Sequence, residues 1–114
     1  MASADEELRK ALGIVLREAR LRNNLSILEL AQQVSGRTYL GALERGEKMP
    51  TIGKLDEISR ELGLHPLAFL MLAYLHIEGN TPEDMMTRIE TDLEAFGSLG
   101  SRKPKSDGVD RSED

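Results

Sequence analysis

Apolar residues recur along most of the chain at intervals of three and four positions, the spacing that places side chains on one face of an α-helix. The first such stretch runs from about Asp5 to Asn23. Its apolar positions are Leu8, Leu12, Val15, Leu16 and Ala19. The strict alternation of apolar and polar residues that marks a half-buried strand is missing. The pattern therefore predicts an all-α protein.

Two shorter helices are expected next. Ser26 is a favourable N-cap, and Glu29 three residues later completes a capping box. The apolar positions of the first short helix are Leu30, Ala31 and Val34. The turn Val34-Ser35-Gly36 should end this helix, since glycine and serine favour turns.

The second short helix is expected from about Arg37 to Arg45. Leu40 and Leu43 form its buried side, and Gly46 is placed to end it in a left-handed conformation. Gly41 lies inside this helix and should weaken it by roughly 0.5–1 kcal/mol relative to alanine.

Three further helices complete the pattern. The first follows the candidate N-cap Thr51 and ends near Leu62, the second begins at Pro66, and the third follows Thr81-Pro82. The first of them should bury Ile52, Leu55, Ile58 and Leu62 on one side. Glycine, serine, proline and charged residues dominate residues 98–114, which predicts a disordered acidic tail.

The formal net charge of -5 argues at first against a nucleic-acid partner. The charge is unevenly distributed, however: residues 1–7 carry -3, residues 8–75 carry +3, and residues 76–114 carry -5. A mildly basic body between acidic ends is compatible with contact to phosphates, although the charge alone is weak evidence.

Several functional classes find no support in the sequence. The chain has no cysteine, and His65 and His76 lack a partner at metal-ligand spacing, so we expect no metal site and no cofactor. No set of serine, histidine and aspartate suggests a hydrolase, and we expect no enzyme. The acidic start resembles no secretion signal, and the longest apolar run, residues 66–75, is far below the roughly 20 residues that span a bilayer. A cytoplasmic protein is the expectation.

Two short helices joined by a tight turn are also a known DNA-reading device. The order and spacing of several short motifs between Leu12 and about Leu70 resemble the lambda-repressor and Cro type of helix-turn-helix, the XRE family. The matching motifs are Leu16-Arg17-Glu18-Ala19-Arg20, Leu25-Ser26, Glu29-Leu30-Ala31, Arg37-Thr38-Tyr39-Leu40, Leu43-Glu44-Arg45-Gly46, Pro50-Thr51, Leu55 and Leu62-Gly63-Leu64. The resemblance covers about half the chain and implies a five-helix DNA-binding domain.

The resemblance also implies roles for individual residues. The positions that contact bases in the family hold Arg37 and Thr38, with Tyr39 and Ala42 on the adjacent groove-facing positions. Tyr39 has an equal alternative, in which its ring packs on a neighbour and only its hydroxyl faces a phosphate. The candidate phosphate contacts are Ser26, Arg45, Lys48 and Arg17, and the residues that match a structural ion pair are Arg20 and Glu44.

The sequence departs from the family pattern at three places, one of which is Gly41 within the second short helix. Ile27 stands where the family usually has a glutamine that touches the DNA backbone, so that contact is expected to be absent. The turn before Arg37 is one residue shorter than usual, which leaves two registers of that helix against the groove open, about one position apart.

The last two predicted helices carry more apolar residues than one buried face requires. The sixth helix either completes the core or forms a homodimer interface, and we favour the interface because methionine-rich apolar patches often bind partners. The candidate interface residues are Leu70, Leu72, Leu75, Met85, Met86, Ile89, Leu93 and Phe96.

The sequence thus predicts a DNA-binding domain over residues 1–78, a C-terminal dimerisation helix over 79–97 and the tail over 98–114. The expected function is that of a bacterial or phage transcription regulator, a homodimer that reads a near-palindromic operator on double-stranded DNA through residues 37–45. The alternative is a protein-interaction module of the same fold, as an antitoxin that binds its toxin.

Overall fold

The computed structural model describes residues 3–34 and 36–97, and this part of the chain is all-helical, as predicted. Its helices are α1 (Ala4–Arg22), α2 (Ile27–Gln33), α3 (Arg37–Glu44), α4 (Ile52–Glu61), α5 (Pro66–Glu78) and α6 (Pro82–Ala95). The chain divides into two compact units, Met1–Gly79 and Asn80–Asp114. Residue Ser35 of the short turn and the expected tail over 98–114 lie outside the described residues.

Side-chain caps fix where most of the helices begin. The hydroxyl of Ser26 accepts a hydrogen bond from the backbone N–H of Glu29, whose carboxylate accepts one from the N–H of Ser26, so the predicted capping box is confirmed. Thr51 and Thr81 cap α4 and α6 as predicted. Ser3 caps α1, because its hydroxyl oxygen accepts a hydrogen bond from the backbone N–H of Glu6. Helix α3 follows Gly36 and has no side-chain cap.

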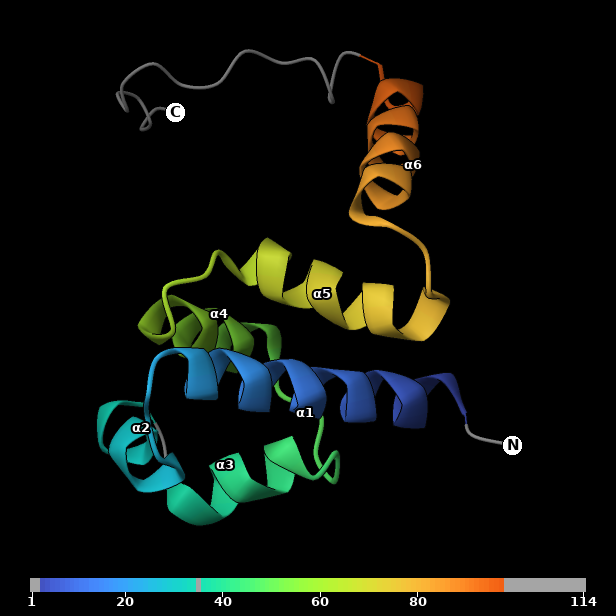
Figure 1. Ribbon diagram of the computed structural model, residues 1–114. Coiled ribbons are helices and arrows are strands. Elements are labelled where there is room, and N and C mark those ends of the chain that lie inside the picture. Colours follow the sequence, from blue (N-terminus) through green and yellow to red (C-terminus); the bar gives the residue numbers. More distant parts are fainter. Residues whose placement is uncertain (1–2, 35, 98–114) are drawn as a thin grey trace, which may run out of the picture. The chain divides into compact units, whose positions relative to one another are not determined.

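In the first unit, α1 lies between two helix pairs (Figure 1). It packs against α3 on one side and against α5 on the other, while α2 packs against α3 and α4 against α5. The residues that are most completely buried come from four of these helices and are Val15, Leu30, Leu40, Ile58 and Ser59. The apolar faces predicted for the first five helices therefore meet in one core.

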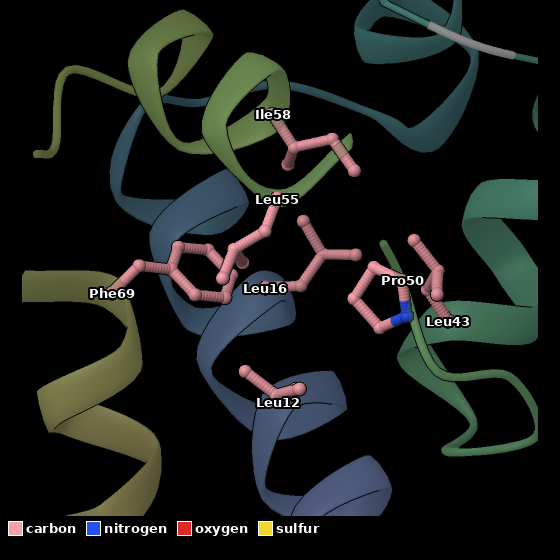
Figure 2. Close-up of a pocket in the computed structure, with 7 residues that line it drawn as sticks. All are labelled: Leu12, Leu16, Leu43, Pro50, Leu55, Ile58 and Phe69. Atoms are coloured by element: carbon pink, nitrogen blue, oxygen red, sulfur yellow. The ribbon is translucent and has the colours of Figure 1, made fainter. Parts of the chain in front are cut away.

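The centre of this core is closed to ligands. Side chains from α1, α3, α4 and α5 and from the segment after α3 converge there (Figure 2), and they are Leu12, Leu16, Leu43, Pro50, Leu55, Ile58 and Phe69. The cavity they leave is about 10 Å³, close to the minimum that one water molecule needs. All of its lining is apolar, so the first unit has a packed core there and no internal binding site.

Two details of the predicted faces are corrected. Ile52 was expected in the core but is 86% exposed, because it occupies the first position of α4, where the helix has not yet turned toward α5. Leu70, expected at a dimer interface, is half-buried and packs against the core of the first unit.

In the second unit, α6 exposes one apolar stripe. Met85 is buried, whereas Met86, Ile89, Leu93 and Phe96 are exposed. None of the helices in the described ranges, 3–34 and 36–97, is long and apolar enough to cross a membrane.

Candidate nucleic-acid interface

Helices α2 and α3 form two short helices joined across residues 34–36 and packed against each other. Leu30 of α2 and Leu40 of α3 are both fully buried in the core. Ile27, the departure from the family pattern, is half-buried and packs against the same core. The arrangement leaves the first turn of α3 exposed, whereas residues 40–43 of this helix are buried.

The first turn of α3 begins with Arg37 and Thr38, both exposed. Neither forms an ion pair or a side-chain hydrogen bond within the described part of the chain, so the guanidinium of Arg37 keeps its donors available. Tyr39 is half-buried and packs against the core, which favours the second of the two interpretations of this residue. The sequence prediction thus placed the two exposed residues correctly.

Ala42 is a correction. Its residue surface is only 5% exposed, so it does not present a side chain toward a groove. The chain folds back after α3, and the backbone N–H of Glu47 donates to the carbonyl of Ala42 at 2.9 Å. The side chain of Ala42 is a single methyl group, which the neighbouring chain covers. The expectation that Ala42 faces DNA is therefore wrong.

A buried ion pair joins α1 to the end of α3. Two nitrogens of Arg20, Nε and Nη2, donate to the two carboxylate oxygens of Glu44 at 2.5 and 3.1 Å, and each side chain is less than one-tenth exposed. The hydrogen bond to Glu44 raises the pKa of Arg20. The remaining nitrogen of Arg20, Nη1, donates to the carbonyl of Leu25 at 2.8 Å. The predicted ion pair is confirmed, and it also fixes the segment between α1 and α2.

Two further contacts fix α3 against α1, and the sequence reasoning missed both. Nη1 of Arg9 donates to the carbonyl of Gly46 at 2.8 Å. At Gly13 the helices approach so closely that a Cβ atom would lie 2.5 Å from the carbonyl oxygen of Glu44 and 2.6 Å from that of Leu43. The signal in the sequence was a glycine within the apolar stripe of a long helix, which marks a close backbone approach.

The candidate phosphate contacts differ in what else they bind. Arg17 and Lys48 are exposed and have no ion-pair partner within the described residues. The hydroxyl oxygen of Ser26 accepts the capping hydrogen bond, which leaves its O–H free to donate. Arg45 is exposed but forms an ion pair with Glu47, and this pairing was not predicted from the sequence.

Over residues 3–34 and 36–97, no cluster of three or more potential ligands could hold a metal ion.

Comparisons with known proteins agree with this geometry. The sequence profile of a helix-turn-helix family matches residues 16–69. Two similar solved structures are both of the clp gene regulator ClgR from Corynebacterium glutamicum. One is 34% identical, with a TM-score of 0.57, and the match covers 59% of this chain and 87% of that chain. The other is 26% identical, with a TM-score of 0.59, and the match covers 84% of this chain and 96% of that chain. Among curated proteins no match is found.

Proposed function

The chain belongs to the XRE-type helix-turn-helix family of DNA-binding transcription regulators, and we propose that it recognises a specific operator with α3 in the major groove. The observation that carries the proposal is the pair of unpartnered side chains, Arg37 and Thr38, at the start of a helix that is fixed to α1. In this class of protein the N-terminal half of the second helix contacts base edges.

Arg37 is the principal reader in this proposal. A guanidinium that donates two parallel hydrogen bonds to O6 and N7 of guanine gives about 1–3 kcal/mol of discrimination against the wrong base. Thr38 follows it on the exposed side of α3 and offers a hydroxyl and a methyl group to the neighbouring base pair. Tyr39, whose ring packs against the core, contributes its hydroxyl to a phosphate.

Phosphate contacts fix the orientation of α3. Lys48 follows α3, Arg17 lies on α1, and Ser26 begins α2, so the three come from different parts of the domain. Each neutralised phosphate releases counterions, and log K should fall with log salt by about 0.9 for each one. The acidic net charge does not oppose this contact, since the excess of acidic residues lies near the two ends of the chain.

Replacing Arg37 with alanine is expected to remove the preference at the base pair that Arg37 contacts, by roughly 5- to 150-fold, while the melting temperature stays unchanged, because the side chain is exposed and has no partner among the described residues. Binding to selected oligonucleotides and thermal unfolding measure the two effects. The contrasting variant is Leu43→Ala, which removes a buried side chain and should cost roughly 2–5 kcal/mol of stability. If the wild-type protein prefers no sequence in a random-oligonucleotide selection, the proposal fails.

We further propose that the protein acts as a homodimer joined through α6. The exposed residues Met86, Ile89, Leu93 and Phe96 are separated by three, four and three positions, the a/d spacing of a two-helix seam. A two-fold dimer would place two copies of α3 on half-sites one DNA turn apart, which is why the operator should be a near-palindrome. Met85, a further candidate, is only 7% exposed and lies outside this exposed stripe; Leu72 and Leu75 belong to α5 in the first unit and stay predictions.

The variant Leu93→Glu is expected to convert the dimer to a monomer, because two carboxylates would be buried at the seam. Analytical ultracentrifugation measures the change. The matched control is Thr91→Glu, which adds the same charge at an exposed position off the apolar stripe and should leave the dimer intact. Equal sedimentation of all three proteins would contradict a dimer interface on α6.

The same exposed stripe supports an alternative, in which α6 binds another protein as an antitoxin binds its toxin. Purification from the native host distinguishes the two. A stoichiometric second protein that is lost in Leu93→Glu, together with a phenotype that is unchanged in Arg37→Ala, would favour the alternative.

A further inference from the structure

Gly41 occupies an unusual place on the recognition helix. It lies four residues after Arg37 and four before Arg45, so the three positions share one face of α3. A Cβ atom built on Gly41 would meet nothing from the core. Apart from the adjoining residues and the backbone of its own helix, the described atoms within 4 Å would be Nη1 of Arg45, at 3.1 Å, and Cζ of Arg45, at 4.0 Å. The side chain of Arg45 therefore folds back over Gly41 toward Arg37.

Glu47 holds the guanidinium of Arg45 in this position. Nε and Nη2 of Arg45 donate to the two carboxylate oxygens of Glu47 at 2.9 and 3.2 Å. This bidentate contact uses the side edge of the guanidinium. Both N–H groups of Nη1 and one of Nη2 remain, and the Nη1–Nη2 end is an edge that can donate two parallel hydrogen bonds to guanine.

We propose that Arg45 reads a guanine in the major groove, that Glu47 is its positioning residue, and that Gly41 leaves the space in which the guanidinium lies. The proposal rests on the DNA-binding function proposed above and replaces the phosphate contact expected for Arg45. Arg45 would then be a second arginine that contacts a base, in addition to Arg37 on the same face of α3.

The charge of Glu47 supports this assignment. An exposed carboxylate beside DNA repels phosphates, so its presence in a DNA-facing segment weakens binding unless it has another effect. Hydrogen bonds from Arg45 lower the pKa of Glu47, and the bidentate contact favours one orientation of the guanidinium. A side chain that is already held in its bound orientation loses less conformational entropy on binding than a free one.

Selection of bound oligonucleotides, with wild type and Arg45→Lys compared at one salt concentration, tests the proposal. Lysine keeps the positive charge but lacks the planar fork. We expect one guanine position in each half-site to lose its preference by roughly 5- to 150-fold, while all other positions keep theirs. A phosphate clamp would instead give an unchanged sequence preference, with affinity lowered evenly if at all, and that result overturns the proposal. The matched control is Lys48→Ala, which should weaken every sequence alike and reduce the salt slope by about one.

Two variants that leave Arg45 in place test the positioning. Glu47→Gln removes the negative charge, so general affinity for DNA should rise while the preference at that same guanine falls. Gly41→Ala places a methyl group 3.1 Å from the present position of Nη1, so the guanidinium must shift and this preference should also weaken, although the variant raises the melting temperature because alanine favours helix. If both variants keep the full preference at that position, Glu47 and Gly41 have no part in the reading. If wild type selects no sequence at all, it is the DNA-binding function that fails.

Discussion

Gly13→Val is expected to lower the free energy of unfolding by about 3 kcal/mol or more, at the upper end of what overpacked substitutions cost. Its Cβ would lie 2.5 Å from the carbonyl oxygen of Glu44, and backbone cannot move aside as a long side chain can. Replacing a glycine inside a helix normally gains roughly 0.5–1 kcal/mol, which is too little to offset the clash. Thermal unfolding should show a decrease in melting temperature of roughly 12–24 °C.

The control for this experiment is Gly53→Val. Gly53 lies in the first turn of α4 and is exposed, and a Cβ there would meet no atom within 4 Å. The two variants add the same side chain to a helical glycine, so they differ only in what surrounds it. Equal melting temperatures for both would show that the close contact between α1 and α3 has no energetic importance.

Glu44→Ala should cost about 3–5 kcal/mol, because it leaves the guanidinium of Arg20 buried with one carbonyl acceptor, that of Leu25. The loss should appear in thermal or denaturant unfolding. DNA binding should fall in proportion to the unfolded fraction, and the sequence preference of the remaining folded protein should not change, since Glu44 reads no base.

A double substitution separates two free energies: the cost of leaving Arg20 buried without its partner, and the net contribution of the ion pair to stability. Arg20→Met combined with Glu44→Leu removes both charges and fills the space with apolar atoms, which is often neutral or stabilising for a buried pair. We expect the double variant to recover most of the stability that Glu44→Ala loses. A double variant less stable than Glu44→Ala would mean that the ion pair contributes attraction beyond the cost of its own burial.

The helices were predictable because their signals are local. The capping box of Ser26 and Glu29 and the apolar spacing of α1 act within a few residues, and both are confirmed. The wrong prediction for Ile52 also has a local physical reason. Apolar spacing assigns a residue to a helical face, but at the first position of a helix the backbone has not yet come into contact with the core.

The site was predictable only in part, because it depends on contacts between distant segments. Arg20 and Glu44 are 24 positions apart, and no spacing rule connects them; the resemblance to a family suggested the pair. Exposure of Arg37 and Thr38 follows from the amphipathic pattern of α3. The burial of Ala42 and the pairing of Arg45 with Glu47 arise where the chain reverses after Gly46, and the path of that segment could not be inferred from periodicity.

Helix α3 has little that would keep it helical in isolation. It is eight residues long, lacks a side-chain cap and contains Gly41, whereas isolated helices shorter than about 12–15 residues are marginal in water. The amide protons of its last turn should therefore exchange with solvent deuterium when α3 separates from α1, whereas its first N–H groups have no acceptor within the helix and exchange without that separation. Separation of α3 from α1 should then remove the recognition surface itself, so conditions that loosen the first unit should reduce the number of binding-competent molecules.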